Sequence, residues 1–236
     1  MKKITNTLIA AIAIASISFT SAFAGMTMGL VANSLKVSAS GTETDTLTAG
    51  GANVADTSVR TKNVSETGVA GSIYLEYTMS ESAWPLAFGI EVTPGTANIT
   101  NKLSRTDSEL SQTGDNISTA ITSIRSAEAS ATGLGTVYIE APLFAGLYFK
   151  AGAARMTVNH ANRSGMDGSS DISGTNLGGG WKTVTEGGYT LKLSYEETDY
   201  DTINLRSTGN SVAANSSAIT GDVDTKAYRF SLGKAF

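Results

Sequence analysis

The chain contains one histidine and no cysteine, which limits the catalytic chemistry that its side chains can carry out. Nucleophilic catalysis by serine needs a base within hydrogen-bond reach of the hydroxyl group. The segment NHANRS brings His160 and Ser164 near each other in sequence, but no recognisable catalytic motif surrounds them. We therefore interpret His160 as an ordinary loop histidine and expect no catalytic residue.

Metal and cofactor ligands are equally sparse in this sequence. Structural zinc sites are built mainly from Cys and His, and the carboxylates that could bind Ca²⁺ instead are scattered pairs, Asp199 with Asp201 and Asp222 with Asp224. A solvated loop explains these pairs equally well. The glycine run 178–180 is followed by Trp rather than by Lys-Ser or Lys-Thr, so it does not resemble a phosphate loop. We expect no metal ion and no cofactor.

Composition narrows the fold class. Charged residues make up 16% of the 236 residues and hydrophobic residues 41%, with mean hydropathy −0.02, whereas soluble domains average about 25% charged residues. The 17 basic and 21 acidic residues give no cationic surface for nucleic acid. No apolar run reaches the roughly 18 residues of a transmembrane helix. An all-β protein remains, either soluble or in a membrane.

The first 24 residues have the pattern of a secretory signal peptide. Lys2 and Lys3 form a positive start, Leu8–Phe19 is apolar, and Ala22-Phe23-Ala24 places small residues at the cleavage positions. Cleavage after Ala24 leaves a domain of residues 25–236 with 15 basic and 21 acidic residues, a net charge of −6. We expect the protein to be exported.

The mature chain alternates apolar and polar residues with period two, which is typical of strands with one buried face. In the first strand the apolar set moves from even positions to Leu35 and Val37, which suggests a β-bulge near Ser34. The eight expected strands lie at about 26–37, 69–79, 84–92, 137–143, 147–153, 175–184, 189–196 and 228–236.

Short and long connections alternate along the chain, as they do in an up-and-down barrel with both termini at the short-turn end. The long connections, at about 40–66, 94–132, 159–174 and 207–221, are expected to be polar loops. Within the longest, Ile117, Ile121 and Ile124 have helical spacing between Asp115 and Glu128, which predicts one or two helical turns. Ten or more strands would result if these loops contain further hairpins.

A soluble β-sandwich would bury the apolar faces as well as a membrane barrel would. The alternation of loop lengths and a set of aromatic residues near strand ends favour the barrel. Those aromatic residues are Tyr77, Trp84, Trp181, Tyr189 and Phe236. In lipid only a closed barrel pairs every edge strand. The residues expected to face lipid are Leu75, Phe88, Ile90, Ile139, Phe149, Leu193, Phe230 and Leu232.

The chain ends in AYRFSLGKAF, with apolar residues at alternate positions up to the final Phe236. This ending resembles the C-terminal targeting strand of bacterial outer-membrane barrels, carried here by Tyr228, Phe230, Leu232 and Phe236. The whole mature chain resembles the family of small eight-stranded outer-membrane barrels, which includes the OmpA membrane domain and the OmpX and Opa types. Lys234 departs from the targeting pattern, and its side chain can snorkel at the rim. The periplasmic domain of OmpA-type proteins has no counterpart here, so we do not expect cell-wall anchoring.

The resemblance implies an outer-membrane location, contact with lipid and lipopolysaccharide, insertion by the barrel-assembly machinery through the C-terminal strand, and a monomer. A few barrels of this kind modify lipid A with a surface His and a Ser. Because no such motif surrounds His160, we expect no enzyme. The preferred hypothesis is a structural and surface-interaction barrel with loops exposed for adhesion or recognition. The alternative is a small channel for water or small solutes.

The residues opposite the predicted lipid face include eight charges. They are Glu76, Glu91, Glu140, Lys150, Lys182, Lys192, Glu196 and Arg229. An eight-stranded barrel is narrow enough for side chains to fill it, and unpaired buried charges are costly. We therefore predict a Glu196–Arg229 pair at mid-depth. We also predict a lumen without a continuous water path and a lower acidic–basic cluster near the short turns, formed by Glu76, Glu140, Lys150, Lys182 and Lys192.

Overall fold

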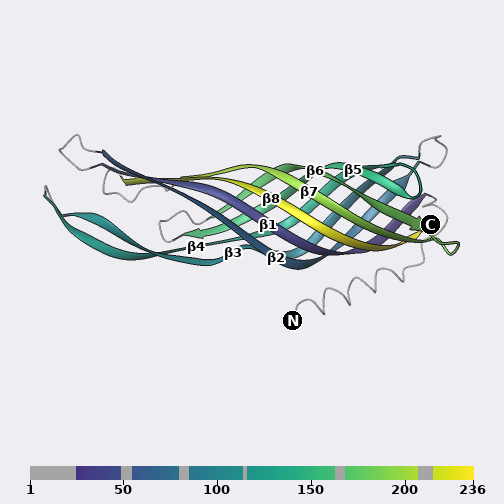
Figure 1. Ribbon diagram of the computed structural model, residues 1–236, viewed down its shortest axis with the longest axis horizontal. Helices are drawn as coiled ribbons and strands as arrows, with labels where there is room; N and C mark the ends of the chain where they lie inside the picture. The colour runs from purple at the N-terminus through teal and green to yellow at the C-terminus, as the bar shows by residue number, and fades with distance from the viewer. Residues whose placement is uncertain (1–24, 49–54, 80–84, 114–115, 163–167, 207–214) are drawn as a thin grey trace.

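The computed structural model describes residues 25–48, 55–79, 85–113, 116–162, 168–206 and 215–236. Eight antiparallel strands pair in sequence order and β8 pairs with β1, so the sheet is a closed barrel (Figure 1). The strands are β1 (Met26–Thr48), β2 (Ala55–Thr78), β3 (Ala87–Thr113), β4 (Asn116–Pro142), β5 (Leu147–Asn162), β6 (Gly168–Val184), β7 (Tyr189–Arg206) and β8 (Asn215–Ala235). The all-β, eight-stranded prediction is confirmed. In the described part of the chain, no helix has the length and apolar character needed to cross a membrane.

The short turns and both ends of the barrel domain lie at one end of the ring. The amide of Gly25 donates to the carbonyl of Phe236 at 3.0 Å, which joins the start of β1 to the end of β8. The turn between β4 and β5 places Ala145 and Gly146 at positive φ, and the turn between β6 and β7 does the same with Gly188. Lys234, the exception in the targeting pattern, lies at this rim with its ammonium 4.6 Å from the Tyr189 ring centroid.

Three of the four long connections, 40–66, 94–132 and 159–174, are strand over most of their length, so that part of the prediction is wrong; of the fourth, the described residues 215–221 belong to β8. The strands continue through them as paired hairpins, and β1 pairs with β2 residue for residue up to Thr48 and Ala55. The predicted helix is also wrong, because Ile117–Ile124 belongs to β4 and pairs with β3. β-Branched Ile and Thr favour an extended backbone wherever a partner strand is available. Asp115 and Ser164 lie outside the described residues.

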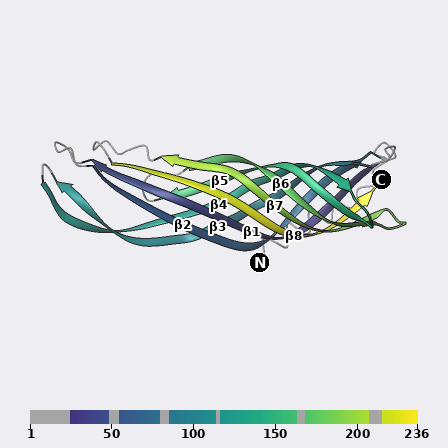
Figure 2. The same ribbon diagram turned by 45° about the horizontal axis from the view of Figure 1, so that its top comes forward.

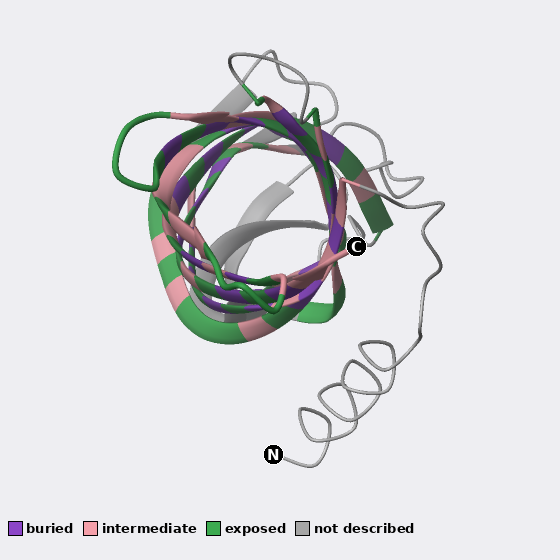
Figure 3. Cartoon of the chain, turned by 90° about the vertical axis from the view of Figure 1, so that its right-hand side faces the viewer, coloured by how far each residue is buried: buried purple, intermediate pink, exposed green. Residues whose placement is uncertain are grey.

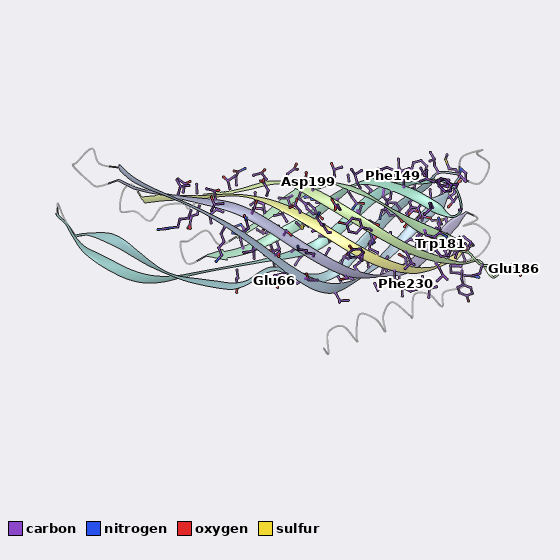
Figure 4. All side chains as sticks on the ribbon, viewed as in Figure 1. Glu66, Phe149, Trp181, Glu186, Asp199 and Phe230 are labelled. Carbon is purple, nitrogen blue, oxygen red and sulfur yellow. The ribbon has the colours of Figure 1, made fainter. Side chains whose placement is uncertain are left out.

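Near the short turns, the barrel exposes its apolar residues and buries its polar ones. Seven of the eight predicted lipid-facing residues have side chains that are at least 42% exposed, and the eighth, Leu75, is partly exposed. Figure 4 shows Phe149, Trp181 and Phe230 in this part of the barrel, with Asp199 further toward the long hairpins. Trp84 is outside the described residues. Figure 3 looks into the ring, where exposed and buried residues alternate along the strands.

The expected bulge near Ser34 is absent, since β1 pairs one-to-one with both β2 and β8 through this point. What changes is the surroundings of the two faces. Met28 and Leu30 face outward below Ser34, whereas Leu35 and Val37 are buried inside the barrel above it. The apolar residues thus move from the outer to the inner face of the wall without an extra residue.

Candidate functional site

The barrel interior carries the residues that could give this fold a function, and it has three layers. The lowest, here called the lower cluster, consists of Glu76, Glu140, Lys182 and Lys192. The ammonium of Lys192 donates to Glu76 and, at 2.7 Å, to Glu140, so it joins the two carboxylates. Lys182 donates to Glu76 at 2.6 Å and lies 3.7 Å from Glu140. Two carboxylates and two ammonium groups make this cluster electrically neutral.

The middle cluster lies above it and consists of Glu91, Glu196, Lys150 and Arg229. The Arg229 guanidinium donates to both Glu91 and Glu196, so the predicted Glu196–Arg229 pair is present. Lys150 lies 2.9 Å from Glu196 and 3.7 Å from Glu91. Its predicted place in the lower cluster is wrong, because counting residues from the turns ignores the stagger between neighbouring strands of a tilted barrel. This cluster also contains two charges of each sign.

The charged side chains of both clusters are almost completely enclosed. All of them are at most 8% exposed except Lys182, which is 23% exposed. The structure therefore brings all eight predicted lumen residues together in two neutral groups. Each cation reaches two carboxylates, which offsets part of the cost of removing charge from water.

Glycine and tyrosine shape the walls around the charges. Tyr138 lies over Gly89, where an added Cβ would come 2.1 Å from the ring. The Tyr138 hydroxyl donates to Glu76 at 3.2 Å, and the Lys150 ammonium lies 4.0 Å from its ring centroid. On β6, Gly178 leaves room for Glu196, since a Cβ would approach the Glu196 Cγ to 2.6 Å. The glycine run 178–180 therefore belongs to strand β6. The sequence did not predict the role of Tyr138, because alternation shows on which face of a strand a residue lies but not which residues it contacts.

The third layer is an upper apolar core inside the hairpin end of the barrel. It includes Leu35 and Val37 of β1, Met156 and Val158 of β5, and Tyr200 of β7, with Met156 0% exposed. The other buried members are Ile99, Ala131, Ala154, Ile172, Ile203, Val223 and Ala227. Sequence analysis missed this layer, although the change of phase at Ser34 was the available signal.

The outer surface around the upper apolar core is polar. Asp199, Asp201, Asp222 and Asp224 are exposed on the neighbouring strands β7 and β8, where Asp199 and Asp224 are direct cross-strand partners. Thr202 donates to Asp222 at 2.7 Å. Among the described residues, no three or more His, Cys, Asp or Glu side chains form a group that could hold a metal ion. His160 lies in β5 and not in a loop beyond it.

Comparison with known proteins finds similarity in structure alone: no family model and no curated protein matches this sequence. Among solved structures, the Ail attachment invasion locus protein of Yersinia pestis matches at 10% identity and TM-score 0.32, covering 83% of this chain and 98% of its own. Neisserial surface protein A matches at 13% identity and TM-score 0.36, covering 87% of this chain and 99% of its own. The Escherichia coli outer-membrane protease OmpT matches at 9% identity and TM-score 0.41, covering 94% of this chain and 99% of its own. These overlays are loose, and the fold is shown by the chain's own closed ring of strands.

Proposed function

We propose that this protein is a non-conducting outer-membrane barrel whose long β-hairpins present a recognition surface outside the cell. The single observation that supports it best is the set of paired charges inside the barrel. Eight interior charges form two neutral clusters, and an apolar core lies above them. An ion crossing this interior would have to break paired charges and then pass a layer of mainly apolar side chains.

The surface around the lower half of the barrel supports a membrane location. Its exposed apolar side chains form a band, which favours burial in hydrocarbon. Exposed Tyr77, Trp181 and Tyr189 lie toward the short-turn end and Tyr195 and Tyr228 lie toward the hairpins, as in the two aromatic belts of membrane proteins. With the short turns in the periplasm, the hairpins extend into the medium. Protease digestion of intact cells tests this orientation, since cleavage within 40–66 or 94–132 is expected from outside.

Single-channel recording in planar bilayers tests the filled lumen. The purified wild-type barrel should show no steady conductance at neutral pH. The alternative function, a small channel for water or solutes, requires a continuous wet path past Arg229 and Met156. Steady wild-type conductance that is unchanged in Glu196→Ala would favour that channel over the proposed function.

We also propose that the protein acts by binding and not by catalysis. Support comes from the sequence, which offers one histidine, no cysteine and no recognisable catalytic motif. Lipid A mass spectra from cells with and without the expressed protein test this proposal, and the two spectra should be identical. Insertion through the C-terminal strand, contact with lipopolysaccharide and a monomeric state belong to the same proposal.

A further inference from the structure

The outer wall of the barrel has a shallow hollow where β8, β1 and β2 run side by side toward the hairpin end (Figures 1 and 2). Its volume is about 280 Å³, and it is lined mostly by small residues. The lining residues are Ser38, Ala39 and Ser40 of β1, Asn63, Val64 and Ser65 of β2, and Asp224 of β8. Serine hydroxyl and asparagine amide groups can both donate and accept hydrogen bonds, so the hollow suits a polar ligand.

The register of the three strands gives the height of this hollow. Tyr228, Ser34 and Val69 lie in one cross-strand row. Tyr228 and Val69 are the last large apolar side chains exposed on β8 and β2 before the hollow begins. Ser38 lies four residues above Ser34 on the same face of β1, since alternate residues of a strand share a face. In the proposed orientation, the hollow therefore faces the medium close to the membrane surface.

A pair of carboxylates at the rim of the hollow has no counter-ion within the described part of the chain. Asp224 is the direct cross-strand partner of Asp199, and both side chains are exposed. Like charges directly opposite each other destabilise a sheet. Lys226, the next residue on this face of β8, already pairs with Glu197 at 3.0 Å, and neither aspartate forms an ion pair with any described residue. A cation bound between the two carboxylates would remove their repulsion.

The surroundings of the two carboxylates favour an organic cation that carries hydroxyl groups over a metal ion. No three His, Cys, Asp or Glu side chains form a metal-binding group in the described residues. One cross-strand row consists of Asp199, Asp224, Ser38 and Ser65. This row crosses four strands, and at a strand spacing of about 4.8 Å it is roughly 14 Å long, which is about the length of three linked sugar rings.

We propose that this hollow binds a short oligosaccharide of amino sugars with free amino groups, taken from the medium. One ammonium group lies between Asp199 and Asp224, where charge-assisted hydrogen bonds supply most of the affinity. The hydroxyl groups of the following rings form hydrogen bonds with Ser38 and Ser65. This inference rests on the proposed surface-recognition function and names a class of ligand for it. A lysine-rich peptide offers the same charge without the hydroxyl-bearing rings, so it is the competing ligand in the experiment.

Isothermal titration calorimetry with the full barrel in phosphatidylcholine nanodiscs tests the site. The probe is the β-1,4-linked tetramer of glucosamine at about pH 5.5, where aspartates of ordinary pKa are ionised, and its binding should be saturable. The N-acetylated tetramer keeps the rings but loses the positive charges, so it should bind at least tenfold more weakly. Tetralysine keeps the charges but loses the rings, and it should also bind at least tenfold more weakly. Equal binding of either control ligand would overturn the proposal.

Two pairs of variants separate the charge from the hollow. Asp224→Asn should weaken binding of the glucosamine tetramer at least tenfold, whereas Asp171→Asn removes an exposed charge from β6 and should weaken it less than twofold. Ser38→Leu fills the hollow at constant charge and should weaken binding at least fivefold, whereas Ser34→Leu, below the hollow on the same strand, should weaken it less than twofold. Circular dichroism should be unchanged in all four variants.

Three results would contradict this site: no wild-type binding at 5 mM tetramer, equal weakening by the two aspartate variants, or wild-type affinity in Ser38→Leu. None of them alters the conductance of the barrel or its cleavage by protease on intact cells, by which the proposed function is judged separately.

Discussion

The two halves of this barrel arrange the same kinds of residue in opposite ways. Near the short turns, Phe149, Leu193 and Phe230 face outward while Glu76 and Lys192 are buried inside. Near the hairpins, Met156 and Tyr200 are inside while Asp171 and Asp199 are exposed outside. One continuous sheet passes through both halves, so the backbone is not the cause of the inversion. The surroundings of the barrel decide which side receives the apolar face. In the membrane location proposed above, the level of the change corresponds to the outer surface of the membrane.

The inversion also explains how each half can be filled. A lumen surrounded by a lipid-facing wall can contain polar groups if they are paired, and the two neutral clusters meet that condition. A wall in water can bury an apolar core in the ordinary way. Substitutions on one strand, placed below and above the level where the polarity reverses, therefore test the two halves separately.

The largest expected effect is in the middle cluster. Glu196→Ala leaves Lys150 and Arg229 without one of their two carboxylates, and loss of one partner in a buried ion pair costs about 3–5 kcal/mol. Urea unfolding from lipid vesicles, followed by tryptophan fluorescence, measures this loss. Glu197→Ala is the matched control, because this next residue faces outward and its carboxylate makes exposed contacts, an ion pair with Lys226 at 3.0 Å and a hydrogen bond from the Tyr195 hydroxyl. Equal destabilisation by the two changes would mean that the cluster does not stabilise the lumen.

The upper apolar core should respond to a loss of volume. Met156→Ala removes a side chain that is 0% exposed, and buried Met-to-Ala changes cost about 2–5 kcal/mol. Its neighbour Arg155→Ala affects a side chain that is 69% exposed, so little destabilisation is expected from that control. If Met156→Ala unfolds at the wild-type urea concentration, this half is not held by a packed core.

The outer surface should respond to a charge in only one half. Leu193→Arg places a charge in the apolar band, where the cost is about 2–4 kcal/mol at mid-depth and falls toward the interfaces. Asp199→Arg changes the same face of β7 six residues further on, above the band, and should refold into vesicles as the wild type does. Comparable refolding yields from the two variants would place the membrane boundary elsewhere. A spin-labelled lipid that quenches a label at residue 193 but not at Ser194 would confirm the register.

The sequence predicted the structure correctly where a strand keeps one alternation of apolar and polar residues and the surroundings of its two faces do not change. Strand number, strand order, the outward set from Phe88 to Phe230 and the Glu196–Arg229 pair all followed from alternation within the lower half. Prediction failed at the change of environment. The shift to Leu35 and Val37 was interpreted as a bulge, although a reversal of polarity outside the sheet produces the same pattern.

The hairpins could not be predicted for a related reason. Ser- and Thr-rich segments such as 40–66 have no apolar alternation, so nothing local separates a strand from a loop. Their pairing depends on the neighbouring strand, as Ser38 opposite Ser65 illustrates. Lys150 was assigned to the wrong cluster because strand stagger is a property of the closed ring, which a count along one strand does not contain.

The smallest expected effect is the pH dependence of an ion pair on the upper outer surface. Thr157 and Arg155 donate to Asp171 at 2.6 and 2.7 Å, and these hydrogen bonds lower the pKa of Asp171 below its usual 3.8. A carboxyl whose pKa is lowered by folding stabilises the protein above its unfolded pKa, and that contribution is lost as the pH falls through the folded value. The stability difference between wild type and Asp171→Asn should therefore be present at pH 6 and shrink below about pH 4.

Because both partners are largely exposed, the difference should be small and should fall further in 1 M salt. Asp199→Asn is the control, since Asp199 forms no ion pair with the described part of the chain. Urea midpoints in vesicles at pH 3, 4 and 6 would measure both variants. If the wild type remains more stable than Asp171→Asn by the same amount at pH 3, Asp171 acts through packing and not through its charge. The ion pair with Arg155 would then contribute nothing to the stability of the upper surface.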